Sequence, residues 1–448
     1  MQLRRRTKVI LICAGVPVAL VATVAIWITL ASRDIPPPDF SDLAFPFQNI
    51  PAEANAHTWF QAAGSNVVWG EHERSVSDRY RNGGTVEVAE VEAILATNAP
   101  ALALLRRGLA CTACQPPLVT NLASLGGINI GPVLGMTKLL SMDSRWKSRH
   151  NDTAGALADC LDLLRFGDLE SRQATSLIQY LAAQSACSMG FATGTNLVTS
   201  GRLNDASLQI LDNALRNLDV GMIGLPNAMR GEFLFSSGVL EDLRWGRIPG
   251  MATPLMTAAD LARLQKSGLP RFLLKPNETR LFYAKGAREV IRNVPLSYRE
   301  TTLRDFEHEF GLQPGSQWQA LLRGNAVGKV LAAAIYPETK NTVEQRCRME
   351  CDRSGLRLLI ACQRYERRNG RLPAKLDELA PEFIEAVPKD PFDGQPLRYS
   401  AERRIVWSVG KNLKDDGGSK MYINGGGETD NRRKMLDYVI DIPPLPKM

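Results

Sequence analysis

The stretch DTAGALADCLDLLRF, from Asp152 to Phe166, decides the fold class of most of this 448-residue chain. Its apolar residues recur at i, i+3, i+4 and i+7, a spacing that places side chains on one face of an α-helix; they are Leu157, Cys160, Leu161 and Leu164. Asp152 and Thr153 are of the residue types that cap helix N-termini. The stretch therefore predicts an amphipathic helix that buries one face against its neighbours.

The same spacing recurs on both sides of this stretch. One predicted helix begins at Asn204 and carries leucines on one side as far as Leu218. Another runs from Val88 to Leu105, and Pro100 predicts that it bends or breaks there.

Other segments extend this helical pattern over residues 51–340. Residues 174–200 predict a long helix rich in small residues, in which Gly190 and Gly194 would let another helix approach closely. Residues 221–276 hold many Gly and Pro, so loops and shorter helices are predicted there, with a sub-boundary near residue 221. A regular solenoid of about 34-residue repeats lacks recurring anchor residues, which favours an irregular antiparallel helical array.

The N-terminal segment predicts a membrane anchor. Val9–Ala31 holds 23 residues without a charge, and a helix of that length reaches about 35 Å, enough to cross a hydrocarbon core of about 30 Å. Basic residues precede it and hold the N-terminus on the cytoplasmic side; they are Arg4, Arg5, Arg6 and Lys8. Residues 1–33 are thus predicted to be a single-pass signal anchor, followed by a proline-rich stalk over 34–50. Cleavage after Thr29-Leu-Ala31 is the alternative.

Net charge excludes one class of partner. The chain has 54 basic and 47 acidic residues, a formal charge of +7. Four of these positive charges lie within residues 1–32, which leaves +3 on the rest. That excess is too small for nucleic-acid binding.

The spacing of Cys111 and Cys114 leaves three alternatives open. This CxxC pair is a local disulfide, a catalytic redox pair or two inert small residues, and no second CxxC completes a zinc site. Cys347, Cys351 and Cys362 share one face of a predicted helix. This indicates that they pack in a buried interface and do not form a reactive site.

The last hundred residues have a different pattern, in which strands follow a helix. A helix from about Thr342 to Asn369 is predicted to end at Gly370. A short helical turn over 376–379 follows, and then strands at 397–399, 405–407 and 438–442. Residues 341–448 thus predict a helix with a small antiparallel sheet, and the whole chain is predicted to be mainly α.

Several strings of this tail occur together in a known order: YERRNGRLP (365–373), LDEL (376–379), PKDPFDG (388–394), LRY (397–399) and WSVG (407–410). In this order they resemble the C-terminal half of type II secretion major pseudopilins over about residues 345–442. The whole chain also resembles uncharacterised anchored proteins of bacterial envelopes. The resemblance implies that the anchor lies in the bacterial cytoplasmic membrane and the C-terminal domain outside it.

The chain departs from pseudopilins in its first residues. Arg6-Thr-Lys8 stands where that family has its processing site, and no acidic residue occurs within residues 1–33. About 300 residues also separate the apolar segment from the pseudopilin-like helix. The resemblance therefore implies a shared fold rather than filament assembly.

The resemblance also implies a calcium loop. Pseudopilins of this kind bind calcium in an aspartate-rich loop, and the matching oxygen donors here are Ser408, Asp415, Asp416 and Asp430. Lys411-Asn-Leu413 stands where the family commonly has an Asp-Gly pair, and Lys414 adds a competing positive charge. A solvated loop whose Asp and Gly residues serve turns is the alternative, so the chain is expected to hold no cofactor unless calcium binds here.

Catalytic motifs are missing from the sequence. The chain has four histidines, none paired for metal binding, and no HExxH, GxSxG, P-loop or GxGxxG occurs. His308 lies between two glutamates, which suits either an acid–base group or a charged helix face. Glu232, Glu241 and Asp242 lie near arginines, so they would line a polar cleft or form ion pairs along a helix. No residue is assigned a catalytic role.

Two functions follow as hypotheses. The first is a membrane-anchored, non-catalytic envelope protein whose helical domain and pseudopilin-like module bind an unidentified protein partner. The second is an envelope hydrolase that uses Glu, Asp and His side chains of the helical domain. The first predicts an interaction surface, and the second predicts converging acidic and histidine side chains.

Overall fold

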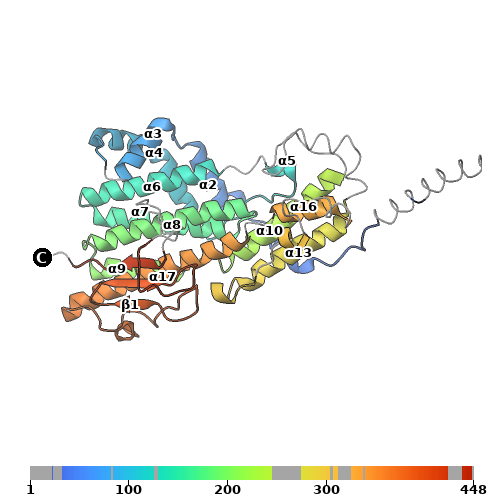
Figure 1. The fold of residues 1–448 in the computed structure, drawn as a ribbon. Coiled ribbons are helices and arrows are strands. Elements are labelled where there is room, and N and C mark those ends of the chain that lie inside the picture. The colour runs from blue at the N-terminus through green and yellow to red at the C-terminus, as the bar shows by residue number, and fades with distance from the viewer. Residues whose placement is uncertain are drawn as a thin grey trace, which may run out of the picture.

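The described part of this computed structural model is mainly helical and carries one small antiparallel sheet near its C-terminus (Figure 1). The structure describes Thr23 and residues 33–81, 84–125, 130–244, 274–302, 306–310, 324–335, 339–421 and 436–445.

The helices of the first half follow one another along the chain. They are α2 (Ala56–Ser65), α3 (Glu71–Arg81), α4 (Val88–Leu109), α5 (Leu122–Leu125), α6 (Gly131–Arg149), α7 (Thr153–Arg172), α8 (Leu177–Thr199) and α9 (Asp205–Arg216). Helices α6, α7 and α8 pack side by side as successive hairpins (Figure 1). The predicted antiparallel helical array is therefore present.

The second half adds longer-range packing. Its helices are α10 (Gly224–Arg244), α13 (Pro276–Asn293), α14 (Phe306–Phe310), α16 (Ala326–Ile335) and α17 (Thr339–Asn369). Short 3₁₀ turns lie at Ser41–Leu43, Ala52–Ala54, Tyr298–Glu300 and Leu376–Leu379. Helix α10 packs on α13 and α8, while α17 reaches α8, α9, α13 and the sheet.

The stretch that begins at Asp152 forms α7 as predicted. The Asp152 carboxylate accepts a hydrogen bond from the Gly155 N–H at 2.8 Å, which caps the helix. Cys160 and Leu164 are fully buried, as the periodicity requires. Asn204 caps α9 in the same way, accepting from the Ser207 N–H at 2.8 Å.

Glycines on α8 allow close helix packing, again as predicted. A Cβ on Gly190 would lie 2.6 Å from Leu164 Cδ2 of α7. A Cβ on Gly194 would lie 2.9 Å from Leu356 Cδ2 of α17. At both positions the absence of a side chain lets a leucine of the neighbouring helix come this close.

Helix α4 corrects the prediction of a break at Pro100. The helix runs unbroken from Val88 to Leu109 with Pro100 inside it. A proline removes one intrahelical hydrogen bond, and burial of the following residues, among them Leu102 and Leu105, offsets that loss.

Helix α10 corrects the prediction of loops and shorter helices in its region. Its glycines serve packing rather than turns: a Cβ on Gly231 would lie 2.1 Å from the Thr175 carbonyl oxygen, and one on Gly238 would lie 1.7 Å from that of Thr120. Residues 245–273, which complete the Gly- and Pro-rich region, lie outside the described residues.

The predicted anchor at Val9–Ala31 lies almost entirely outside the described residues. Within the described ranges, α4 is the helix that is long and apolar enough to cross a membrane. Its core residues pack against α2, and core helices of soluble proteins have the same length and composition.

The segment predicted as a stalk lies along α10 and α13. The ring of Phe40 packs at a tilted angle against that of Phe233 of α10, with centroids 5.0 Å apart. Arg288 of α13 donates to Asp42 at 2.7 Å, and the Asp34 carboxylate accepts from the Asn277 N–H, also at 2.7 Å. Residues 34–43 are thus bound to the helical body rather than standing apart from it.

The predicted C-terminal elements are present. Helix α17 ends at Asn369, followed by Gly370 with a φ of +70°. Strands β1 (Arg398–Ser400), β2 (Ile405–Ser408) and β3 (Tyr438–Asp441) pair antiparallel in the order β1-β2-β3. In register, Val406 faces Tyr399 on one side and Ile440 on the other.

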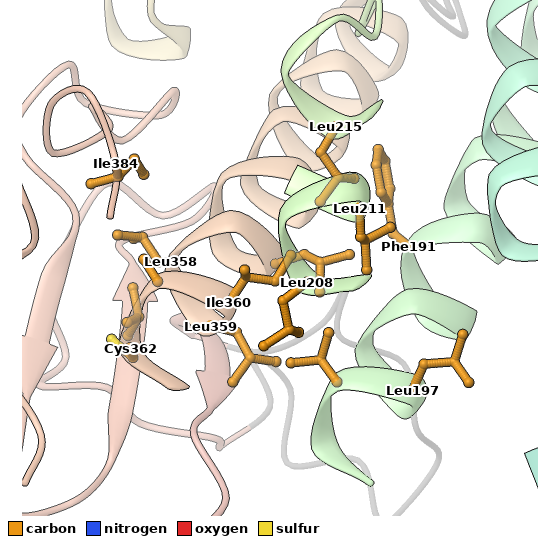
Figure 2. Close-up of a cluster of buried hydrophobic side chains, with 14 of the residues drawn as sticks. Phe191, Leu197, Leu208, Leu211, Leu215, Leu358, Leu359, Ile360, Cys362 and Ile384 are labelled. Atoms are coloured by element: carbon orange, nitrogen blue, oxygen red, sulfur yellow. The ribbon is translucent and has the colours of Figure 1, made fainter. Parts of the chain in front are cut away.

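One hydrophobic cluster joins this module to the helical array, and we call it the shared core (Figure 2). Its labelled members come from α8, α9, α17 and the chain after α17: Phe191, Leu197, Leu208, Leu211, Leu215, Leu358, Leu359, Ile360, Cys362 and Ile384. Polar contacts also join α17 to the helical array, since Arg357 of α17 donates to Asp212 of α9 at 2.7 Å. The boundary predicted near residue 341 therefore runs through a continuous core.

Candidate functional site

Three side chains distant in the sequence meet between α2, α7 and the segment after α4. They are His57, Cys114 and Glu170, and their potential ligand atoms all lie within 4.8 Å of one another. His57 Nδ1 lies 3.1 Å from Glu170 Oε1, and Cys114 Sγ lies 3.7 Å from the same oxygen. We call this group the His–Cys–Glu cluster.

Asn55 fixes the backbone that carries two of the three side chains. Its side-chain oxygen caps α2 by accepting from the His57 N–H at 3.1 Å, and it also accepts from the Gln115 N–H at 2.9 Å. Its amide nitrogen donates to the Gln115 carbonyl at 2.9 Å. One side chain therefore holds the start of α2 and the backbone beside Cys114 together.

Arg165 joins α7, which carries Glu170, to the segment that carries Cys114. Its guanidinium extends from α7 to the end of α4, where it donates to the Leu109 carbonyl at 2.6 Å and the Cys111 carbonyl at 3.1 Å. Helix α7 also carries Glu170. The three donors of the cluster are thus set by backbone clamps on both sides.

Burial determines the state of the thiol. Cys114 is 3% exposed. Burial and the neighbouring Glu170 carboxylate raise the pKa of the Cys114 thiol well above its ordinary value. The thiol is therefore protonated, so it is a hydrogen-bond donor to Glu170 rather than a nucleophile. Neither Cys111 nor Cys114 is in a disulfide in this structure.

A second buried cluster of charges lies between α4, α6 and α7. The carboxylate of Asp159 is fully buried and accepts from Lys147 at 2.7 Å and Arg106 at 2.8 Å. Lys147 also donates to Asp143 at 2.8 Å, and Arg106 to Asp162 at 3.1 Å. Burial and the charge of Asp143 raise the pKa of Asp159 to about 7, against the lowering effect of both cations.

The predicted calcium donors have other partners. Ser408 donates to Asp390 at 2.7 Å inside the module. Asp415 accepts from the Trp407 indole at 2.9 Å, and Asp416 accepts from the Asn412 amide at 2.8 Å. Asp430 lies outside the described residues. The three described donors thus each bind a different protein group.

Asp437, which the sequence did not single out, organises the same loop. Its carboxylate accepts from the N–H groups of Gly418 at 2.8 Å and Ser419 at 3.0 Å, and from that of Asp416 at 3.3 Å. The sequence shows only that Asp437 comes just before the strand β3, and a single Asp at such a position does not predict that it binds a loop.

The predicted acidic residues of α10 do not share one site. The Glu232 carboxylate accepts from the Leu177 N–H at 3.2 Å, at the start of α8, and burial raises its pKa. Glu241 pairs with Arg280 of α13 at 2.5 Å. His308 lies exposed on α14.

The His–Cys–Glu cluster was missed by sequence analysis because its members are separated by more than 50 residues. Cys114 was noted only for its CxxC spacing, and His57 has no second histidine nearby. The contact between them depends on Asn55, whose role is not visible from spacing. Comparison of the chain with protein-family models, curated proteins and solved structures found no match.

Proposed function

We propose that this chain is a membrane-anchored, non-catalytic protein of the bacterial envelope that presents its helical array and C-terminal module to a protein partner. Residues 9–31 would cross the cytoplasmic membrane once, with the N-terminus inside and the rest outside. The uncharged segment and the bases before it support this topology. The pseudopilin-like strings of the tail support the envelope location, without filament assembly.

The shared core is the observation that carries the proposal. Leu208 of α9, Leu359 of α17 and Val406 of β2 belong to one buried cluster. Two parts that share a core hold one relative orientation, so a partner would meet a single fixed surface rather than two domains that move independently.

Exposed apolar side chains suggest where a partner binds. Ile178 and Leu181 lie near the start of α8, and Met222 and Ile223 just before α10, all 39–49% exposed. The two segments meet at Tyr180, because a Cβ on Gly221 would lie 2.5 Å from the Tyr180 hydroxyl. Neighbouring exposed apolar residues are typical of interaction sites.

Site-specific photo-crosslinking in intact membranes tests the proposal. A photoreactive residue replaces Ile178 or Ile223 in the full chain, and the matched control replaces Ile210, an equally exposed isoleucine on α9. One discrete product of the same partner mass from both test positions, absent at Ile210, is the expected result. Equal products at all three positions, or none at the test positions, would overturn the proposed surface.

Topology has its own test. A C-terminal phosphatase reporter that is active only outside the cytoplasm should be active in the full chain. It should lose activity when residues 9–31 are deleted. An inactive reporter on the full chain would contradict the proposed orientation.

The His–Cys–Glu cluster favours the second candidate function, an envelope hydrolase. A histidine and a carboxylate in contact can act as a general base. Purified full-length protein would then hydrolyse members of an ester or amide panel, and Glu170→Gln would abolish that activity. Turnover that is unchanged in Glu170→Gln would exclude this cluster as its source.

A further inference from the structure

We propose that His57, Cys114 and Glu170 bind one divalent metal ion of the zinc class. This site is independent of the proposed partner-binding function, so either can fail without the other. An imidazole nitrogen, a thiolate and a carboxylate are the three kinds of ligand that zinc takes in proteins. Calcium and magnesium prefer oxygen donors alone, so the sulfur of Cys114 selects against them.

The distances in the cluster suit a tetrahedral ion. Zinc–ligand bonds of about 2.0–2.3 Å place neighbouring ligand atoms about 3.3–3.6 Å apart. The separations here are 3.1 Å between His57 Nδ1 and Glu170 Oε1, and 3.7 Å between Cys114 Sγ and the same oxygen. The three atoms lie within 4.8 Å of one another, so small side-chain rotations would bring all of them onto one ion.

The scaffold around the cluster resists collapse. The Asn55 clamp and the Arg165 contacts fix the backbone on both sides of Cys114. The side chain of His57 is 13% exposed and that of Glu170 is 7% exposed, so the imidazole marks the edge nearest to solvent. Water can therefore supply the fourth ligand from the His57 side.

Metal binding releases one proton and neutralises the charge of the ion. The Cys114 thiol releases its proton to solvent as the metal–sulfur bond forms, and the hydrogen bond from that thiol to Glu170 is lost. One thiolate and one carboxylate then neutralise the dication. The buried cluster would carry no net charge with the metal bound.

Cobalt(II) is the probe for this site, because its thiolate complexes have a charge-transfer absorption that oxygen and nitrogen ligands alone do not give. Metal-free, full-length protein in detergent is titrated with Co(II) under reducing conditions. We expect one equivalent to produce the charge-transfer band, and one equivalent of Zn(II) to remove it. No band in the wild type would overturn the proposal.

Two cysteine variants identify the cysteine whose sulfur binds the metal. Cys114→Ser should lose the band, whereas Cys111→Ser, three residues away and partly exposed, should keep it. A band that persists in Cys114→Ser would overturn the assignment. Far-ultraviolet circular dichroism checks that each variant is folded.

His57→Ala provides a second, less buried test. It should weaken Co(II) binding by more than about tenfold, since a lost ligand costs more than a lost outer-shell partner. Unchanged affinity in His57→Ala would contradict the ligand set even if Cys114→Ser does not fold.

Discussion

At the scale of single residues, Asp159 is a buried carboxylate with a raised pKa and a defined set of charged partners. It is fully buried between Lys147 and Arg106, and Asp143 adds a second negative charge beside it. Burial disfavours the charged form and the cations favour it, and burial has the larger effect here. Its pKa of about 7 in the folded protein compares with 3.8 for an exposed aspartate.

We predict that Asp159 makes the protein less stable as pH rises. Between pH 3.8 and about 7 the folded state holds a proton on Asp159 that the unfolded state has lost. The free energy of unfolding should therefore fall with pH in this window, by at most about 1.4 kcal/mol per pH unit. Denaturant titrations of wild type and Asp159→Asn at several pH values measure this contribution as the difference between the two curves.

The matched control is Asn204→Ser, a change at the N-cap of α9 that adds and removes no titratable group, because Ser caps as well as Asn. Its stability curve should run parallel to that of the wild type. Parallel curves for Asp159→Asn would contradict the shifted pKa.

The aspartate-rich loop gives a second residue-scale prediction. Asp415, Asp416 and Asp437 already accept hydrogen bonds from protein N–H groups. Calcium would need these carboxylates to turn from their protein partners toward one ion, so we expect the Tm of the full chain to be the same in millimolar calcium and in chelator. A calcium-dependent rise in Tm that Asp416→Asn abolishes would instead establish the loop as a calcium site.

At the scale of elements, helix contacts depend on glycines whose surroundings differ. A Cβ on Gly167 of α7 would lie 2.8 Å from the Ala183 backbone carbonyl and 2.5 Å from Cys187 Sγ. A Cβ on Gly194 of α8 would meet only the ends of side chains, the nearest being Leu356 Cδ2 at 2.9 Å. Backbone atoms cannot move aside as a leucine methyl can.

We therefore predict that Gly167→Ala lowers the free energy of unfolding by about 1–3 kcal/mol. Gly194→Ala should cost less, because Leu356 can shift and the Ala183 backbone cannot; the gain of about 1 kcal/mol from the helix propensity of alanine is common to both variants. Chemical denaturation of both variants measures the difference. An equal or larger loss for Gly194→Ala would contradict the packing of α7 against α8.

Most elements were predictable because their signals are local. The spacing of Leu157, Cys160 and Leu164 and the cap at Asp152 defined α7, and Gly370 marked the end of α17. Helix α10 was not predicted, since glycine has the same local effect whether it makes a turn or a close contact. The contact of Gly231 with Thr175 is visible only once the helices are packed.

The candidate site was not predictable, for the same physical reason. His57, Cys114 and Glu170 are brought together by tertiary contacts, above all by Asn55, and no motif links them in sequence. The predicted calcium loop came instead from a resemblance over a continuous stretch. That resemblance could not show that Asp437 would bind the loop backbone.

At the scale of the whole molecule, α17 links the two predicted parts. Its apolar residues lie in the shared core. Its charged residues pair with the helical array, as Arg364 does with Asp205 of α9 at 2.7 Å. On the other side of α17, a Cβ on Gly355 would lie 1.8 Å from Ile440 Cδ1 of β3. The C-terminal sheet and the helical array therefore pack on opposite faces of one helix.

Native-state hydrogen exchange of the full chain tests this account most directly. If the shared core makes one cooperative body, the slowest-exchanging amides of α7 and of β2 should report the same free energy of opening. Both values should also fall together in a core variant such as Leu359→Ala. Opening of β2 at a distinctly lower free energy, with α7 still protected, would show two independent domains and contradict the single fixed surface.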